Sequence, residues 1–172
     1  DGEVVDVGSA VTFVGTVSDA EDIPSDIELS WSSSIDGPFS TQGANSNGGI
    51  SFPVTTLSTG LHVITVTATD SAGLTDSLSI SLRVNTPPPA PSIALTPASP
   101  TTIDGLQVSV TATADADGDN VSYSYSWTKD GALTSQTAAS VSASSTAAGE
   151  VWAVTVTPND GYTDGAGTTA SI

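Results

Sequence analysis

Apolar and polar side chains alternate strictly through Val121-Ser122-Tyr123-Ser124-Tyr125-Ser126-Trp127, a run that ends in tryptophan. A period of two places successive side chains on opposite faces, so this run is typical of a β-strand with one buried face. The same pattern occurs earlier, in Ile27-Glu28-Leu29-Ser30-Trp31. Each tryptophan shares its face with the apolar residues of its run. Trp31 and Trp127 are therefore predicted to fill the core of a β-sandwich, rather than to form an exposed surface for stacking on sugars.

The two tryptophan strands belong to a repeat that divides the chain nearly in half. In each half a strand-like run and an acidic cluster precede the tryptophan strand, and an Asp-Gly turn follows it. A second long strand follows later, at His62–Asp70 in the first half and at Trp152–Asp160 in the second. Turn signals recur roughly every ten residues, and no window has a sustained helical period. The sequence therefore predicts an all-β fold of two antiparallel sandwiches.

Consecutive prolines separate the two repeats, in the stretch Thr86-Pro87-Pro88-Pro89-Ala90-Pro91. Such a stretch adopts an extended, semi-rigid conformation, which is typical of a spacer between domains. We therefore expect a first domain over residues 1–85, a Pro-rich linker over residues 86–91 and a second domain over residues 92–172.

One strand of the second repeat has no counterpart in the first. Ser92–Thr96 precedes Gly105 in the second repeat, whereas only Asp1–Val7 precede Gly8 in the first. The first strand of the first domain is thus expected to be missing or supplied by a neighbour. Two explanations stay open: a fragment cut from a longer tandem array, and a fibre subunit whose open edge accepts a strand from its neighbour.

The chain is strongly acidic, with 19 Asp and Glu residues against 2 Lys and Arg residues and a formal net charge of -17. Nucleic acids and anionic membranes attract basic surfaces, so neither is a default partner. Direct membrane insertion is not expected either, because no apolar run approaches the roughly 20 residues of a spanning helix. Cysteine is absent, which excludes disulfides and thiolate metal sites. Stability must then come from the cores, from bound metal or from neighbours in an array.

Acidic residues gather in loops, most densely in Asp115-Ala116-Asp117-Gly118-Asp119-Asn120, with an acidic counterpart in Asp19-Ala20-Glu21-Asp22. Oxygen ligands at alternate positions, with a glycine that lets the chain fold back, are what Ca²⁺ requires; a solvated Asp/Gly turn is the alternative. In a sandwich the loop after the penultimate strand can lie at the same end. The expected ligands are Asp19, Glu21, Asp22, Asp70 and Asp76 in the first domain, and Asp115, Asp117, Asp119, Asn120, Asp160 and Asp164 in the second. One or two ions per domain remain open.

A catalytic role is not expected. The single histidine, His62, aligns with Trp152 of the second repeat and shares a face with Ile64 and Val66, which indicates a structural residue rather than a catalytic base. A carboxylate pair for glycoside hydrolysis is formally available among so many acids. However, a general acid needs a desolvated carboxyl group, so clustered aspartates in turns fit metal binding better.

Three stretches resemble the cadherin-like and PKD-like immunoglobulin-fold repeats of prokaryotic extracellular surface proteins: Val14–Asp22, Leu29–Trp31 with Asp36-Gly37, and Gly60–Gly73. The resemblance implies two tandem immunoglobulin-like (Ig-like) antiparallel β-sandwiches joined by a Pro-rich linker. It also implies a spacer, adhesive or structural role, often with stiffening by calcium. Trp31 is followed by serines instead of the usual PKD core signature, which favours a cadherin-like, generic Ig-like label.

These observations lead to an extracellular structural or adhesive module, stabilised by Ca²⁺, in a surface adhesin, surface layer or filament. Its expected partners are neighbouring repeats or identical subunits in an array or fibre, with cell-surface glycans as a further candidate. The alternative is a carbohydrate-binding or spacer module of a secreted polysaccharide hydrolase. In that case Tyr123, Tyr162 or a tryptophan would contact the sugar.

Overall fold

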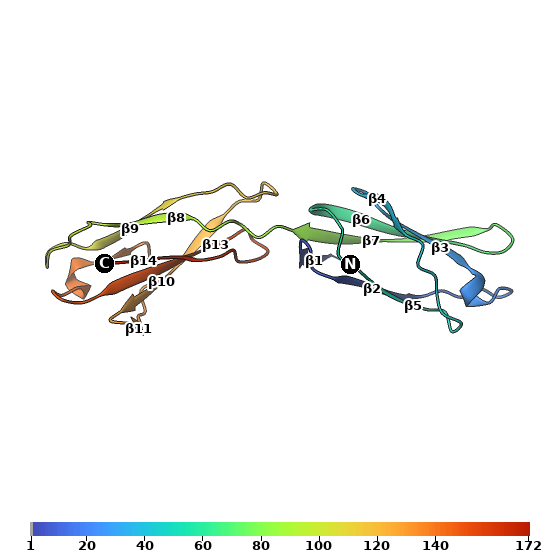
Figure 1. Ribbon diagram of the computed structural model, residues 1–172, viewed down its shortest axis with the longest axis horizontal. Helices are drawn as coiled ribbons and strands as arrows, with labels where there is room; N and C mark the ends of the chain where they lie inside the picture. The colour runs from blue at the N-terminus through green and yellow to red at the C-terminus, as the bar shows by residue number, and fades with distance from the viewer. Residues whose placement is uncertain (1) are drawn as a thin grey trace. The chain divides into compact units, whose positions relative to one another are not determined.

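The computed structural model describes residues 2–172, which form β-strands, turns and two short 3-10 helices, η1 (Pro24–Asp26) and η2 (Ala143–Ser145) (Figure 1). The chain divides into two compact units, with unit 1 ending at Thr86 and unit 2 running from Pro87 to Ile172. Each unit is a β-sandwich with its own core. The predicted all-β fold of two tandem Ig-like sandwiches is confirmed. Within residues 2–172, no helix is long and apolar enough to cross a membrane.

Unit 1 contains a large and a small sheet. All strand pairs are antiparallel except that of β1 with β7, which is parallel. The large sheet has the spatial order β1 (Glu3–Asp6), β7 (Thr75–Asn85), β6 (Gly60–Thr69), β3 (Glu28–Ser33), β4 (Gly37–Ser40), and the small sheet pairs β2 (Val11–Thr16) with β5 (Gly49–Val54).

Aromatic rings from both sheets meet in the core of unit 1. Trp31 on β3 lies 5.6 Å from Phe13 on β2 and 5.0 Å from Phe52 on β5, measured between ring centroids. The indole Nε1–H donates a hydrogen bond of 3.1 Å to the carbonyl oxygen of Gln42, so the buried ring leaves no polar atom unsatisfied. The predicted core position of Trp31 is confirmed, since only 7% of it is exposed.

His62 is also part of this core and has no exposed surface. Its Nε2 lies 2.6 Å from the carbonyl oxygen of Ser58, and its Nδ1 lies 2.6 Å from Ser33 Oγ. A carbonyl oxygen can only accept, so Nε2 carries a proton, and in the neutral ring Nδ1 accepts the hydroxyl proton of Ser33. Ser33 Oγ in turn accepts the backbone N–H groups of Ile35 and Asp36 at 3.1 Å each. The imidazole thus connects β6 to the turn after β3.

Unit 2 also consists of two sheets, and all of their strand pairs are antiparallel. One sheet has the order β11 (Ala132–Leu133), β10 (Ser122–Lys129), β13 (Trp152–Asn159), β14 (Thr168–Ser171), and the other has the order β12 (Ser140–Val141), β9 (Leu106–Thr111), β8 (Ser92–Thr96).

The core of unit 2 is built around Trp127, which is fully buried. Its ring packs edge to face on Trp152, with 6.2 Å between centroids. Its Nε1–H donates a hydrogen bond of 2.9 Å to the carbonyl oxygen of Ala138. Ala138 lies 11 residues after Trp127, and Gln42 lies 11 residues after Trp31. The two units therefore repeat the same tryptophan anchor, and the predicted core position of Trp127 is confirmed.

The proline run that joins the units is fixed to unit 2 at two points. Thr168 Oγ1 donates a hydrogen bond of 2.7 Å to the carbonyl oxygen of Pro91. A side chain at position 165 would collide with the carbonyl oxygen of Pro88, so only the glycine present there allows this approach.

Candidate metal centre

Unit 2 holds three carboxylates close together in the loop between β9 and β10. Oxygens of Asp115, Asp117 and Asp119 all lie within 4.8 Å of one another. Asp115 is buried, and the other two are half-buried. Over residues 2–172 no other three acidic, histidine or cysteine side chains come this close. The densest acidic cluster of the sequence therefore becomes a compact group of oxygens in the fold.

The two carboxylate oxygens of Asp115 have different surroundings. Oδ1 accepts the backbone N–H groups of Asp117 at 2.8 Å and Asp119 at 3.4 Å, which folds the loop as an Asx turn. Gly118 completes the turn with a φ of 81°, a left-handed conformation that glycine adopts without strain. Oδ2 is buried and has no hydrogen-bond partner. Burying an acceptor without a partner costs free energy, so this oxygen needs a donor or a cation.

The donor set fits a hard cation such as calcium better than it fits zinc or copper. All three side chains offer carboxylate oxygens, whereas zinc and copper prefer nitrogen or sulfur ligands. Oxygens bind Ca²⁺ at about 2.3–2.6 Å, so two ligands on opposite sides of the ion lie about 5 Å apart. Three oxygens that all lie within 4.8 Å of one another can therefore contact a single ion of this kind. Backbone carbonyls and water would complete the 6–8 oxygens that Ca²⁺ takes.

The remaining predicted ligands of unit 2 do not join this group. Ser122 pairs with Asn159, so the loop after β13 emerges at the same end of the sandwich as the Asp115 loop. Asp160 is buried, but its Oδ1 accepts the N–H groups of its own turn, those of Tyr162 and Thr163 at 2.8 Å each. Asp164 accepts from Asn159 Nδ2 at 2.7 Å, and Asn120 is exposed. A role for Asn120, Asp160 and Asp164 as calcium ligands stays a prediction.

Unit 1 repeats the turn of Asp115 at the equivalent position. Asp19 Oδ1 accepts the N–H groups of Glu21 at 2.9 Å and Asp22 at 3.0 Å. The bond from Glu21, and then that from Asp22, hold the pKa of the Asp19 carboxyl below its usual value of 3.8. Asp19 is exposed, unlike Asp115, so its second oxygen can be solvated by water.

Three of the other predicted ligands of unit 1, Asp22, Asp70 and Asp76, accept hydrogen bonds. Asp22 accepts the backbone N–H of Ser71 at 2.9 Å and its hydroxyl at 2.8 Å. Asp70 and Asp76 accept backbone N–H groups within their own hairpin, and together with Asp19 they line one shallow hollow. Among the residues that the structure describes, unit 1 has no group of three carboxylates within reach of one ion. The ligand set Asp19, Glu21, Asp22, Asp70 and Asp76 stays a prediction.

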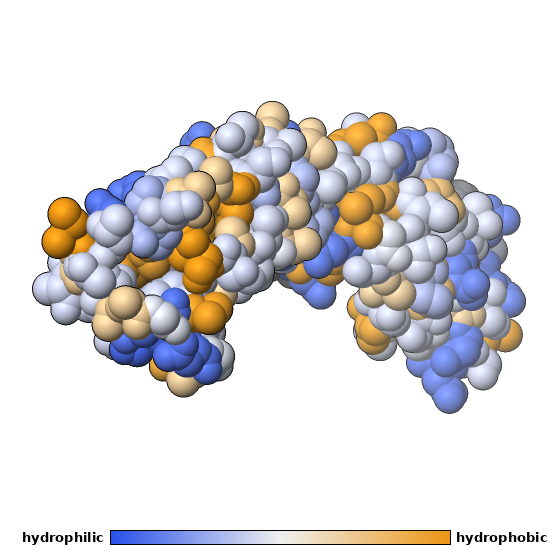
Figure 2. All heavy atoms as spheres, turned by 60° about the vertical axis from the view of Figure 1, so that its left-hand side comes forward, coloured by the Kyte–Doolittle hydropathy of each residue, from blue (hydrophilic) through white to orange (hydrophobic). Residues whose placement is uncertain are grey.

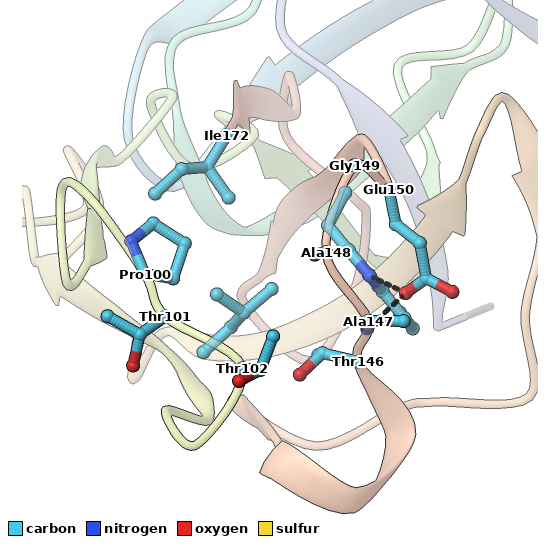
Figure 3. A pocket seen from close by; sticks show the side chains of 11 residues that line it. Pro100, Thr101, Thr102, Thr146, Ala147, Ala148, Gly149, Glu150 and Ile172 are labelled. Carbon is cyan, nitrogen blue, oxygen red and sulfur yellow. Dashed lines mark hydrogen bonds between the residues drawn. The ribbon is translucent and has the colours of Figure 1, made fainter.

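A hollow of unit 2, shown in Figure 3, is lined in part by Glu150. Its carboxylate accepts hydrogen bonds from Lys129 Nζ at 2.8 Å, from the backbone N–H of Ala147 at 2.9 Å and from Trp152 Nε1 at 3.0 Å. Glu150 is the one acidic residue among those lining the hollow, and the others are neutral. This arrangement holds a carboxylate in its ionised form and offers no acid–base pair.

The stability of unit 2 is expected to fall in acid as Glu150 becomes protonated. Lys129, then Trp152 and Ala147, stabilise the carboxylate and lower its pKa from 4.5 to about 2. In the unfolded chain the ordinary pKa returns. The stabilisation is therefore complete above pH 4.5 and is lost as the pH falls from there to about 2. The Glu150→Gln substitution should lower the melting temperature of unit 2 at neutral pH. The melting temperature of this variant should also fall less steeply than that of the native chain between pH 4.5 and about 2.

Thermal melts across the pH range, followed by circular dichroism, would measure this effect. Glu28→Gln is the matched control, because Glu28 is an exposed residue of unit 1 and its replacement removes the same charge. If the Glu150→Gln variant has the same melting profile as the native chain, the Glu150 carboxylate is not the source of this acid-sensitive stability.

The chain is similar to known proteins in its fold. No protein-family model matches the chain, and no curated protein sequence matches it either. Among solved structures, a multidomain fragment of titin matches 97% of this chain with a TM-score of 0.58 and 13% sequence identity. The chain spans 61% of the length of that titin fragment.

Two further solved structures match almost the whole chain with lower TM-scores. The fibronectin(III)-like modules of CbhA from Clostridium thermocellum have a TM-score of 0.44 and 16% identity, over 99% of this chain and 88% of that one. A 1.5-MDa bacterial ice-binding adhesin has a TM-score of 0.45 and 20% identity, over 98% of this chain and 60% of that one. The chain is a pair of tandem Ig-like β-sandwiches.

Proposed function

We propose that the chain is an extracellular structural or adhesive module, a cadherin-like pair of Ig-like repeats in which unit 2 binds calcium and is stabilised by it. The observation that carries this proposal is the buried, partnerless Oδ2 of Asp115 beside the carboxylates of Asp117 and Asp119. A bound Ca²⁺ would satisfy that oxygen and remove the repulsion among three negative charges. Loop sites of extracellular modules bind calcium with dissociation constants of about 10⁻⁴–10⁻³ M, which suits the concentration outside cells.

The overall charge supports the same proposal. A net charge of -17 makes the folded state repel itself, and only Lys129 and Arg83 oppose it as permanent cations. Lys129 is already engaged with Glu150. A divalent ion is the simplest source of further positive charge. Its contribution to stability is greatest where calcium is plentiful, as it is for a surface protein.

A structural role is favoured over catalysis by the state of the one histidine. His62 is fully buried, and both ring nitrogens are held, one by Ser33 and the other by the Ser58 carbonyl. It has neither access to a substrate nor a nitrogen free to take a proton from one. We therefore propose no reaction for this chain.

The carbohydrate-binding alternative has less support. All three tryptophans are buried, and Tyr123 and Tyr125 are half-buried against the core. Tyr162 is the one aromatic side chain of residues 2–172 that is largely exposed, at 45%. Sugar stacking depends on open aromatic faces, and a single exposed ring makes a poor platform.

The proposal is tested by thermal melting of the whole chain in EGTA and in millimolar calcium. At ten times its dissociation constant, calcium should stabilise unit 2 by about 1.4 kcal/mol, a rise in melting temperature of roughly 5–10 °C. Asp117→Asn should abolish most of this rise, because it replaces one of the three anionic ligands with a neutral amide. Glu28→Gln removes the same charge elsewhere and should keep the full rise. Identical melts of the native chain with and without calcium would refute calcium stabilisation.

A further inference from the structure

Strands β2 and β9 occupy equivalent places in the two units. Each has six residues with the same order of buried and exposed positions, and each has one partner strand from later in its unit, β5 for β2 and β12 for β9. On its other side β9 lies beside β8 and pairs with it (Figure 1). Ile93 and Leu95 of β8 pack against the core. No strand within residues 2–172 pairs with the corresponding side of β2. Unit 1 therefore has an open strand edge where unit 2 has a covered one.

The backbone of β2 is oriented to accept a strand at this edge. The N–H of Val17 donates to the carbonyl oxygen of Gly48, on the β5 side. Peptide groups alternate in direction along an antiparallel strand, so those of Thr12, Val14 and Thr16 point away from β5. The residues of β9 at the same places are paired with β8. β2 thus offers three unused positions in the register that β8 uses in unit 2.

The opposite edge of the small sheet is interrupted by a proline. Pro53 of β5 stands opposite Thr12 in the ladder, in a pair whose peptide groups point away from each other. Proline has no N–H, so it cannot donate to a strand added on the outer side of β5. The edge of β2, which contains no proline, is therefore the better place to extend the ladder.

An apolar groove runs beside the free edge of β2. It has a volume of about 460 Å³ and lies between the two sheets, with Phe13 and Gly15 on one wall and Val66, Leu78 and Ile80 on the other. Leu78 is 66% exposed. A side chain at position 15 would meet only Ile50 Cδ1, at 4.0 Å, whereas unit 2 has Val110 there, opposite Ile93 of β8. The groove therefore has room for the side chains of one more strand.

This groove differs from scattered apolar exposure. On the face drawn in Figure 2, apolar side chains form small patches separated by polar ones, as is usual for a folded protein. The groove instead brings apolar side chains of both sheets together along a strand edge that has no partner strand within residues 2–172. Exposed apolar surface of this kind marks an interaction site.

Charge indicates what kind of partner fits. A second copy of the chain would also carry a net charge of -17, and two such molecules repel each other. The strand that covers the equivalent edge in unit 2 is Ser92–Thr96, which has no charged residue and has apolar side chains at alternate positions. A short uncharged strand matches the groove without the repulsion.

We propose that the free edge of β2 is a docking site for an added β-strand, an extended and uncharged segment of a partner polypeptide with apolar side chains at alternate positions. The strand runs antiparallel to β2 and pairs with Thr12, Val14 and Thr16, as β8 pairs with β9. Its two apolar side chains lie in the groove over Phe13 and Gly15. The calcium site is in the other unit, so this interaction is expected in EGTA as well as in calcium.

A synthetic peptide with the sequence of residues 91–97 is the probe, titrated into the whole chain in EGTA and followed by amide NMR. We expect saturable binding that shifts the amide signals of Thr12, Val14 and Thr16 and slows their hydrogen exchange. A peptide with serine in place of Ile93 and Leu95 should not bind. Absence of saturable binding, or binding that leaves these amides unchanged, would overturn the proposal.

The matched variants are Val14→Pro and Val14→Thr. Proline removes an N–H that faces away from β5. It should therefore leave unit 1 folded and lower the affinity for the peptide by about tenfold or more. Threonine keeps the N–H and the β-branched shape and should bind as the native chain does. Thr16→Pro serves the same purpose nearer the strand end if Val14→Pro disturbs folding. Equal peptide affinity in the proline and threonine variants, or a dimer in sedimentation that the peptide does not dissociate, would contradict strand docking.

Discussion

Trp127→Ala is expected to destabilise unit 2 by about 3–5 kcal/mol, the range found when a large buried aromatic side chain is removed. Trp127 is fully buried, packs edge to face on Trp152 and donates its indole proton to the Ala138 carbonyl. The substitution leaves a cavity and an unpaired carbonyl oxygen together. Since a domain of this size has a total stability of about 5–15 kcal/mol, unit 2 should be close to unfolded at physiological temperature.

Urea unfolding followed by tryptophan fluorescence would measure the loss. Trp31 reports on unit 1 and should keep its transition, because the two cores share no residue. Trp127→Phe is the graded control, since it keeps most of the ring volume but removes the donor to Ala138. It should fall between the native chain and the alanine variant. A loss below about 1 kcal/mol for Trp127→Ala would show that this ring does not organise the core.

The effect of Asp115→Asn on the stability of unit 2 is expected to change sign when calcium is added. In EGTA the variant should be as stable as the native chain or more so, because the amide removes a buried charge and reduces repulsion with Asp117 and Asp119. The side-chain oxygen that closes the Asx turn is retained. In saturating calcium the native chain should become the more stable, by about 1–3 kcal/mol, because only the carboxylate can serve as a charged ligand.

Asp19→Asn is the matched control for this reversal. Asp19 forms the same Asx turn in unit 1, but it is exposed and belongs to no three-carboxylate group. Its substitution should change stability little and equally in both conditions. If Asp115→Asn destabilises the chain by the same amount with and without calcium, its carboxylate serves the turn alone.

Local patterns in the sequence were enough to predict the two tryptophan strands, the later strands β6 and β13, and the core positions of both tryptophans. The alternating run at Val121–Trp127 lies almost entirely within β10, and Ser92–Thr96 has the same bounds as β8. Period-two alternation works here because one face of each strand meets the core. The repeat also located the acidic loops, since turn chemistry is written in adjacent residues.

Features that depend on contacts between distant residues could not be predicted in this way. β1 pairs in parallel with β7, about eighty residues later, and parallel pairing leaves no local periodic signal. The pair Lys129–Glu150 joins residues 21 positions apart. Asp115 and Asp19 have the same turn, yet only Asp115 is buried with an unsatisfied oxygen. That difference comes from packing, which adjacent residues do not reveal. The sequence alone therefore predicted similar metal sites in both halves.

Calorimetric titration of Ca²⁺ into the whole chain is the most direct test of the claim that Asp115, Asp117 and Asp119 hold a cation. The native chain and Asp19→Asn should both show one saturable site with a dissociation constant of about 10⁻⁴–10⁻³ M. Asp115→Asn should lose that site while remaining folded. Binding of the same affinity in Asp115→Asn, or no binding by the native chain at millimolar calcium, would contradict the account.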